Sequence, residues 1–514
     1  MTDPKVKRRH FSAVSKVLLI EPPNSLVVGF NATVVVEPLG LEFIAGSVAD
    51  MADVKIFDMR VDETPIDRML NDFQPDLVGL RGNYTVDVRA VLDVARQVKK
   101  IAPGLPVVVG GHHLSLSPHD AYSPDIDAIV VGDGEVPFRD LLLNINRCNR
   151  MDTTDSVIFQ DSNGDFDTTN HQLRPKTALK QFDAPAMNQR PIPSRHLVDH
   201  YRKHYYFLYH ESPYSIETAR GCIYRCTFCS VHEFHRGEYR MQGIDRTLQE
   251  LQELPKNAWV NVVDDLAIQE LPASVKSQVP DGYDPMVDMA EQVIQMKLGQ
   301  RYWMQVRADN VVRNPEKFEK WAEAGLDTVL IGLESFDQSD LNSVSKGSKT
   351  TDNAKAIEIL HSFGIRIWGG VLIFQNWLER NFDDLKQAVL GYEIEFPQFT
   401  IMTPLPGTKL WRDVEKDIIS TEPNFYDFLH SVLPTRLSGK EFYEQYASLW
   451  RTVGAGGMQR ARNMLQEVAT TRESVTRFLR QYKTLADVET YRRGIDMLEQ
   501  ASPQPHRALE TAKT

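Results

Sequence analysis

The stretch Gly221-Cys222-Ile223-Tyr224-Arg225-Cys226-Thr227-Phe228-Cys229 holds three of the four cysteines of the chain, spaced Cys-x3-Cys-x2-Cys. Three thiolates so close together, in an odd number, cannot all pair as disulfides. They can ligate three irons of a [4Fe–4S] cube, because soft thiolates suit iron–sulfur clusters. The fourth iron would then lack a protein ligand and be open to a small molecule. The alternative is a zinc site with His232 or His235 as the fourth ligand.

Length and composition limit the kind of protein. A chain of 514 residues is too long for one core and predicts two or three domains. The 58 basic and 70 acidic residues argue against nucleic acid as a bulk partner. Four cysteines and a cluster motif indicate a reducing cytoplasm, and Cys148, far from the others, is predicted to be an ordinary free thiol. We find no signal peptide and no apolar run long enough to span a membrane, whereas a peripheral membrane contact stays open.

The first third of the chain alternates short apolar runs with helical segments. The runs fall at 16–20, 53–57, 77–80, 107–109 and 128–131, with helical segments such as 38–46 and 86–100 between them. This alternation predicts a doubly wound parallel sheet of the flavodoxin or Rossmann type, with helices on both faces. Ligands of such sheets bind at the carboxyl ends of the strands. Those ends read Arg81-Gly82-Asn83-Tyr84, Gly110-Gly111-His112-His113 and Gly132-Asp133-Gly134-Glu135.

The middle of the chain repeats the alternation with longer helices. Strands are predicted at 215–220, 259–263, 302–306, 328–332, 366–373 and 398–402, and helices at 245–254, 285–297, 315–324, 352–363 and 381–392. This order predicts a partial (β/α)6 barrel, with chemistry at the carboxyl ends of its strands. Polar residues follow three of them: Asp264-Asp265, Arg307-Ala308-Asp309 and Gly332-Leu333-Glu334-Ser335.

The C-terminal hundred residues read as helical, with periodic segments at 439–452, 460–471 and 474–485. They form either a helical cap packed on the barrel or a lid over the substrate. The predicted organisation is therefore a tail at 1–15, a sheet domain at 16–148, a linker with a short hairpin around 158–166 at 149–205, a barrel at 206–410, a helical region at 411–500 and a disordered tail at 501–514.

The cysteine spacing, with Phe228 directly before the last cysteine, resembles the signature of the radical S-adenosylmethionine (SAM) enzymes. In that family the open iron chelates SAM, so the resemblance implies that Cys222, Cys226 and Cys229 hold the cluster. A doubly wound domain upstream of such a motif resembles the cobalamin-binding domain of the B12-dependent members. The Asp-x-His-x-x-Gly motif is absent, so we expect cobalamin without a histidine of that motif on cobalt, and a neighbour for the lower face from the loop 81–84.

The resemblance also implies cofactor contacts. For SAM they are Phe228, Asp264, Asp265, Arg307, Glu334 and Ser335; for cobalamin they are Arg81, Gly82, Asn83, Gly110, Gly111, His112, Gly132, Asp133, Gly134 and Glu135. Within the family, the segments 37–42, 82–84, 262–267 and 430–437 are most similar to the hopanoid C-3 methylase group. An insertion at 273–283, near the expected substrate entrance, departs from that group, whereas the loop 403–408 matches a family loop that closes the barrel.

This resemblance implies a C-methyltransferase. A radical derived from SAM would abstract hydrogen from an unactivated carbon, and methylcobalamin would supply the methyl group. The substrate would be a hopanoid or another small natural product, the electron donor a ferredoxin or flavodoxin, and no side-chain acid or base is required. The alternative is a cobalamin-dependent oxidase or cyclase without net methyl transfer. A redox sensor is disfavoured by the intact SAM elements, and a methylthiotransferase by the lack of a second cysteine trio.

Overall fold

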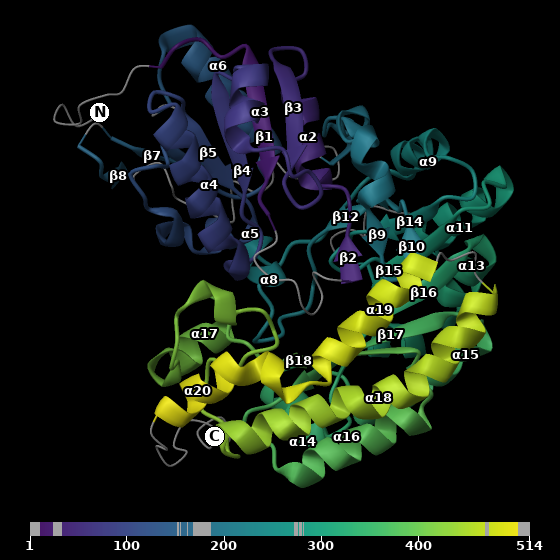
Figure 1. Cartoon of the computed structure of the whole chain (residues 1–514). Coiled ribbons are helices and arrows are strands. Elements are labelled where there is room, and N and C mark those ends of the chain that lie inside the picture. The colour runs from purple at the N-terminus through teal and green to yellow at the C-terminus, as the bar shows by residue number, and fades with distance from the viewer. Residues whose placement is uncertain are drawn as a thin grey trace. The chain divides into compact units, whose positions relative to one another are not determined.

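A computed structural model of the chain divides it into two compact units (Figure 1), and each is described by itself. One unit comprises Met1–Val27 and Glu37–His204, and the other comprises Val28–Val36 and Tyr205–Thr514. The structure describes residues 11–23, 33–151, 154, 156–161, 163–167, 187–271, 276, 280, 282–467 and 472–501. The predicted tails at 1–15 and 501–514 and the insertion at 273–283 lie mostly outside these residues.

The first unit is built on a seven-stranded sheet in the order β3-β1-β4-β5-β6-β7-β8. Five strands are parallel: β1 (Lys16–Glu21), β3 (Asp53–Asp58), β4 (Leu77–Arg81), β5 (Val107–Gly110) and β6 (Ala128–Val130). Their side chains are buried on both faces, which explains the continuous apolar runs in the sequence. The hairpin expected around 158–166 forms as β7 (Val157–Gln160) and β8 (Phe166–Asp167), which extend the sheet by antiparallel pairing.

Helices cover both faces of this sheet. Helices α3 (Ile66–Phe73) and α4 (Val88–Ile101) pack with β1, β4 and β5 in one apolar core. Helices α2 (Leu39–Val48) and α6 (Glu135–Cys148) contact each other, and a short helix α5 (His112–Leu116) follows β5. The predicted doubly wound fold is therefore confirmed, and its strand ends meet at one edge.

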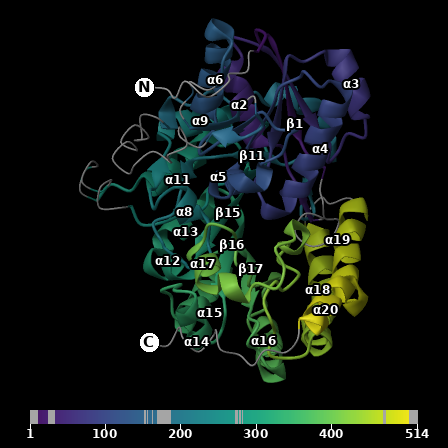
Figure 2. The same ribbon diagram turned by 90° about the vertical axis from the view of Figure 1, so that its left-hand side faces the viewer.

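The second unit contains a six-stranded parallel sheet in the order β11-β14-β15-β16-β17-β18. Its strands are β11 (Tyr214–Ile216), β14 (Trp259–Val262), β15 (Arg301–Arg307), β16 (Leu326–Glu334), β17 (Arg366–Ile373) and β18 (Phe396–Ile401). The intervening helices are α9 (Ile244–Glu253), α11 (Pro285–Met296), α13 (Pro315–Ala324), α15 (Thr350–Ser362) and α16 (Glu379–Gly391), with short helices α12 (Ala308–Arg313) and α14 (Gln338–Ser343). These helices lie on the outer side of the sheet (Figures 1 and 2), as the predicted partial barrel requires.

Aromatic side chains close the barrel at the amino ends of its strands. A three-stranded sheet, β10 (His210–Glu211), β9 (Tyr206–Phe207) and β2 (Val34–Val35), brings Phe207 into contact with tryptophans near the starts of β14, β15 and β17. The polar residues Asp264, Arg307 and Glu334 lie at the other side of the barrel, at the carboxyl ends of its strands.

Two predicted elements differ in the structure. The strand expected over 215–220 is split, because the Thr218 N–H and hydroxyl both donate to the Asp264 carboxylate instead of continuing the ladder. The helices expected at 439–452 and 460–471 are one helix, α18 (Gly439–Glu467). Glycine weakens a helix by about 1 kcal/mol without necessarily ending it, and α18 is supported by packing against α16, α19 (Arg472–Leu485) and α20 (Arg492–Gln500).

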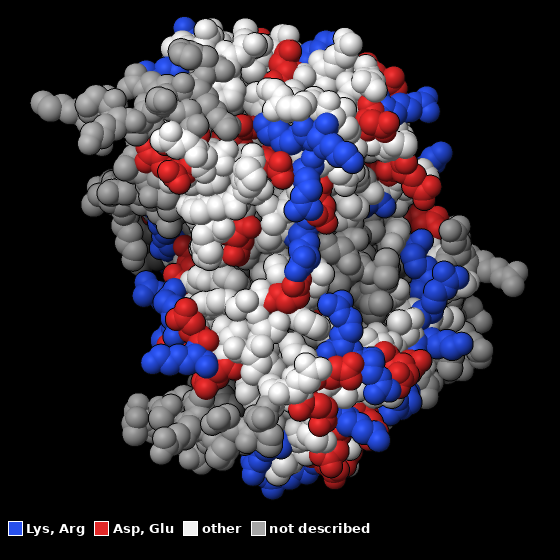
Figure 3. All heavy atoms as spheres, turned by 60° about the vertical axis from the view of Figure 1, so that its left-hand side comes forward, with Lys and Arg blue, Asp and Glu red and all other residues white. Residues whose placement is uncertain are grey.

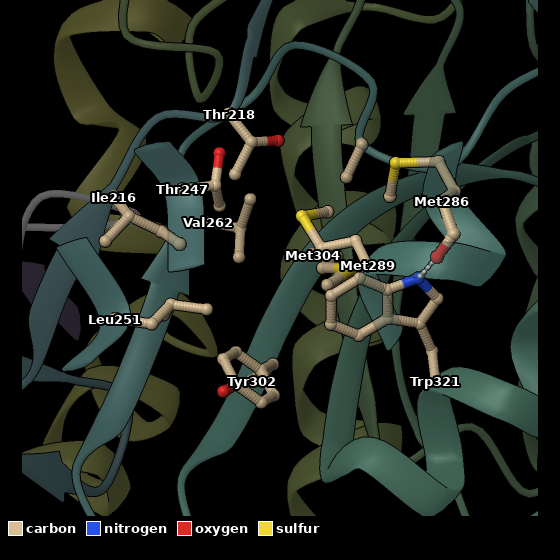
Figure 4. Close-up of a pocket in the computed structure, with 11 residues that line it drawn as sticks. Ile216, Thr218, Thr247, Leu251, Val262, Met286, Met289, Tyr302, Met304 and Trp321 are labelled. Carbon is tan, nitrogen blue, oxygen red and sulfur yellow. Dashed lines mark hydrogen bonds between the residues drawn. The ribbon is translucent and has the colours of Figure 1, made fainter. Parts of the chain in front are cut away.

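A small apolar cavity lies between the barrel sheet and helices α9, α11 and α13 (Figure 4). Met286, Met289 and Met304 line it beside Trp321, whose indole N–H donates to the Met286 carbonyl at 3.0 Å. It belongs to the core behind the sheet. Thr218, Thr247 and Tyr302 also line it, and their hydroxyl groups donate to Asp264, to the Gly243 carbonyl and to Gln300. Among the described residues, no helix is long and apolar enough to span a membrane. Basic side chains lie beside acidic ones over the face in Figure 3, unlike a continuous basic surface for nucleic acid.

Candidate cofactor sites

The three cysteines lie on one loop of the second unit, closed at its base. Strands β12 (Ala219–Arg220) and β13 (Arg240–Met241) pair antiparallel and close this loop. The loop comprises residues 221–239 and is called the cluster loop. Cys222 and Cys229 are partly exposed, whereas Cys226 is buried. Phe228 packs its partly buried ring against the barrel core.

Backbone hydrogen bonds hold the cluster loop from three directions. The Gly221 N–H donates to Asp265 Oδ2 at 2.9 Å, and the Thr227 N–H donates to the Val344 carbonyl at 3.2 Å. The Thr227 carbonyl accepts the Leu410 N–H at 2.8 Å, which ties the loop to α17 (Lys409–Val414) after the last barrel strand. The loop is therefore preorganised by segments far away in the sequence.

The two histidines of the zinc alternative differ in their surroundings. His235 Nδ1 lies 2.9 Å from Arg240 Nη2, and its Nε2 lies 3.2 Å from Asp265 Oδ2, so both ring nitrogens face protein partners. His232 Nε2 lies 3.7 Å from Glu233 Oε1. Within the described part of the chain, no three His, Cys, Asp or Glu side chains converge tightly enough for one metal ion. A cube, by contrast, places each thiolate on a different iron and needs no such convergence.

Burial dominates the electrostatics of the free thiols. It raises the pKa of Cys229 to about 12 and also raises the pKa of Cys222, with the neighbouring Cys226 adding to both. Cluster ligands must be thiolates, so metal binding has to displace protons from these two positions.

A positive charge lies directly behind the cluster loop. The Arg307 guanidinium, at the end of β15, is 5 % exposed and places Nη1 at 3.6 Å from Cys226 Sγ. Burial works to lower the pKa of Arg307, but Asp309 and Cys226 outweigh it and the pKa is raised. Arg307 therefore stays charged beside the buried thiol.

The other residues predicted for SAM are placed unequally. Glu334 ends β16 with a left-handed backbone (φ 58°), and its Oε1 accepts from Lys346 Nζ at 2.6 Å. Gly332 makes room for this ion pair, because a Cβ there would lie 2.5 Å from Glu334 Oε1 and 2.7 Å from Lys346 Nζ. Ser335 instead donates its hydroxyl to Asp340 Oδ2 at 2.8 Å.

Asp264 and Asp265 both accept hydrogen bonds from the backbone around the start of the cluster loop. Asp264 is buried under Thr218, and burial raises its pKa to about 7. Asp265 accepts from Gly221 and faces His235. The structure thus places Arg307, Glu334 and the three cysteines at or directly after the ends of strands, with Lys346 beside Glu334. Asp264 is buried, whereas the Asp265 side chain is 25 % exposed.

In the first unit, the glycine-rich loops meet at the edge predicted for cobalamin. Asn83 joins the loops after β4 and β5, since its carbonyl accepts the His113 N–H at 3.1 Å and its Oδ1 accepts the His112 N–H at 3.3 Å. Gly111 (φ 125°) is required by this contact, because a Cβ would lie 2.5 Å from Asn83 Oδ1. Gly82, Gly110 and Gly134 are also packed closely against protein atoms.

Gly132 behaves differently from the other glycines. Its φ is 87°, and a Cβ there would meet nothing within 4 Å. Asp133 and Glu135 follow it, and Glu135 begins α6 with its side chain buried. The backbone at Gly132 is therefore open to a neighbour from outside the sheet, which fits a loop that a bulky cofactor approaches.

Sequence reasoning missed a charged network at the ends of three adjacent strands. Glu21, Asp58 and Arg81 are the last residues of β1, β3 and β4. Arg81 is paired with Glu21, and Arg60 binds Asp58 through Nε at 2.9 Å and Nη2 at 2.6 Å. Arg81 is thus held by protein, whereas the neighbouring Tyr84 side chain is 51 % exposed. The sequence could have indicated this network, because each of the three strand-end residues directly follows buried apolar residues.

Family models match both units. A model of the B12 binding domain matches residues 25–142, and one of the Radical SAM superfamily matches residues 216–389. The chain therefore belongs to the cobalamin-dependent radical SAM enzymes, whose cofactors are a [4Fe–4S] cluster, SAM and cobalamin. This confirms the family predicted from the sequence.

Two relatives and one solved structure are similar to the chain at sequence identities of 28% or less. The chain is 28% identical over 414 residues to a hopanoid C-3 methylase of Methylococcus capsulatus, covering 79% of this chain and 74% of that protein. It is 24% identical over 432 residues to an anaerobic magnesium-protoporphyrin IX monomethyl ester cyclase of Synechocystis, covering 81% of each. The solved structure of OxsB, a cobalamin-dependent SAM radical enzyme with aqua-cobalamin and SAM bound, has a TM-score of 0.65 and 18% identity, covering 97% of this chain and 78% of that one. At this identity the structural likeness shows the fold alone.

Proposed function

We propose that this protein is a C-methyltransferase that acts on an unactivated carbon of a small molecule. The observation that carries the proposal is the presence, in one chain, of an anchored three-cysteine loop and a glycine-rich edge that fits cobalamin. The similarity to the hopanoid C-3 methylase over 79% of the chain favours a methyl group as the group transferred. A polycyclic hydrocarbon such as a hopanoid is the first substrate to test.

In this proposal the residues bind, orient and shield rather than exchange protons. When bound, the three cofactors supply hydrogen abstraction and a methyl group. Cys222, Cys226 and Cys229 hold the cluster, and Glu334 with Lys346 offers an acceptor and a donor for the zwitterionic end of SAM. Gly132 and the loop at 81–84 receive cobalamin. The C-terminal helices α18 to α20 cover the barrel or the substrate, and a ferredoxin or flavodoxin provides electrons.

A second candidate is an oxidase or cyclase that leaves no methyl group on its product. It is favoured by the similarity to magnesium-protoporphyrin cyclases, which extends over 81% of the chain. Both candidates use the same cofactors, so only the product separates them.

The test is the mass of the product. The protein is reconstituted without oxygen with iron, sulfide and hydroxocobalamin, then given dithionite, SAM carrying a deuterated methyl group, and a pentacyclic triterpene. Methyl transfer predicts a product that is heavier by the labelled methyl group, and Cys226→Ala abolishes it. A product that has lost hydrogen and gained no label would reject the methyltransferase and favour the cyclase.

A further inference from the structure

The contacts of Arg307 point to a role other than the SAM contact that its motif suggested. Its Nε donates to Asp309 Oδ1 at 2.9 Å, and its Nη2 donates to the Lys346 carbonyl at 2.7 Å. Its Nη1 lies 3.6 Å from Cys226 Sγ, within the range of an N–H···S hydrogen bond. Each of the three nitrogens therefore has an acceptor within the protein, and one of those acceptors is a predicted cluster ligand.

The face of the guanidinium is fixed as well. Arg307 Cζ lies 3.6 Å from the centre of the Tyr224 ring, and Tyr224 is part of the cluster loop between Cys222 and Cys226. The Tyr224 hydroxyl is held in turn, because it donates to Asn310 Oδ1 at 2.8 Å and accepts from Arg313 Nη2 at 2.7 Å. The planar cation is thus clamped by an aromatic face and two hydrogen bonds, and it has little freedom to turn toward another ligand.

We infer that Arg307 acts on the iron–sulfur cluster through Cys226 and raises its reduction potential. Reduction adds one electron, and therefore one negative charge, to a cluster that three thiolates already make anionic. A buried cation and an N–H donor at a ligand sulfur stabilise the more negative state. Because Arg307 is 5 % exposed, water screens this interaction little. The inference depends on a cluster being bound and not on which group is transferred, so failure of methyl transfer leaves it standing.

The test is a dithionite titration of the reconstituted full-length protein without SAM, followed by the electron paramagnetic resonance of the reduced cluster. Arg307→Met removes the charge and the donor while keeping an elongated side chain. At the midpoint potential of the wild-type cluster, the ratio of reduced to oxidised cluster in Arg307→Met is expected to fall about tenfold. This change corresponds to ~59 mV for a one-electron couple. Iron and sulfide contents are measured in every variant.

Arg313→Gln is the matched control. Arg313 is also cationic and also contacts Tyr224 and Asp309, but it pairs with Glu270 rather than with a cysteine. Its loss is expected to change the ratio less than about threefold, since screening weakens charges away from the cluster. Equal shifts in Arg307→Met and Arg313→Gln would overturn the inference, because any nearby cation would then suffice.

A separate readout excludes the SAM role. If Arg307 instead bound SAM, Arg307→Met would weaken SAM binding in equilibrium dialysis and leave the cluster potential unchanged. Should Arg307→Met fail to retain a cluster, Arg307→Lys carries the test. An ammonium cannot serve Asp309 and Cys226 together in the same way, so a lowered potential is still expected, and a wild-type potential would contradict the inference.

Discussion

The buried carboxyl group of Asp264 makes the stability of the folded protein depend on pH. It is 1 % exposed and accepts from the Thr218 N–H at 2.7 Å, and burial raises its pKa from 3.8 to about 7. The folded protein therefore holds a proton at Asp264 in a pH range where the unfolded chain has lost it. By linkage, the stability from this group is fully present below pH ~4 and is lost as the pH rises toward ~7.

The prediction for Asp264 compares wild type with Asp264→Asn. The amide is neutral at every pH, so the free energy of unfolding of the wild type should decrease relative to Asp264→Asn between pH ~4.5 and ~7. The change is on the order of 3 kcal/mol at most, since each pKa unit corresponds to about 1.4 kcal/mol. Urea denaturation at a series of pH values measures it. A difference that is constant with pH would show that Asp264 is ionised in the folded protein.

At the residue scale, the sequence predicted the strand-end positions of the candidate site residues better than the partners of their side chains. The three cysteines stay a prediction as cluster ligands. Arg307, Glu334 and Ser335 lie where the alternation of strands and helices puts them. Their partners could not be predicted, because Lys346 reaches Glu334 from 12 residues away and Asp340 takes the Ser335 hydroxyl. Such pairs depend on how the turns after β16 fold, and no periodicity in the sequence records that.

Among the elements, the cluster loop offers a sharp test of geometry. Gly221 (φ 94°) and Gly237 (φ 72°) both have left-handed backbones and lie at opposite ends of the loop. A Cβ on Gly221 would lie 1.9 Å from the Glu238 carbonyl oxygen, whereas one on Gly237 would meet nothing nearer than 3.8 Å. An alanine would therefore have a strained backbone at either position, but it would clash with the backbone of Glu238 only at position 221.

Gly221→Ala is expected to lose the cluster, and Gly237→Ala is expected to keep it. The alanine at 237 costs about 1–2 kcal/mol for its left-handed backbone, whereas the alanine at 221 must also push the two ends of the loop apart. Iron and sulfide analysis after reconstitution gives the result. Equal cluster contents in both variants would mean that the loop accommodates the displacement and that its closure is not needed for ligation.

Element boundaries show where local patterns stop being informative. The strands β14 to β18 and helix α13 fall within two residues of their predicted ranges. The strands are largely buried apolar runs, and the helix begins at Pro315. The break at Thr218 could not be predicted, since its hydrogen-bond partner Asp264 lies 46 residues further along the chain. The continuity of α18 was also missed, because glycines at 454, 456 and 457 suggest an end that packing overrides.

For the whole molecule, the division into two units predicts that the two cofactor sites can be lost separately. Gly132→Val fills the open space at the edge of the first unit and strains a left-handed backbone. We expect it to abolish cobalamin binding, followed by the visible spectrum, while the iron content stays at the wild-type level. The three cysteines and their anchors all belong to the second unit.

Gly164→Val is the control for this change. Gly164 (φ 92°) also has a left-handed backbone with nothing within 4 Å of a Cβ, but it lies in the turn between β7 and β8. It should suffer the same strain and still bind cobalamin. If both valine variants lose cobalamin to the same degree, strain in the first unit explains the loss and the assignment of Gly132 to the cofactor is wrong.

The most direct measurement of the central claim gives the reconstituted protein SAM with a deuterated methyl group under dithionite, without any substrate. Mass spectrometry then follows 5′-deoxyadenosine and the label in the cobalamin fraction. The account predicts both, with 5′-deoxyadenosine lost in Cys226→Ala. An intact cluster and bound cobalamin that yield neither product would contradict it.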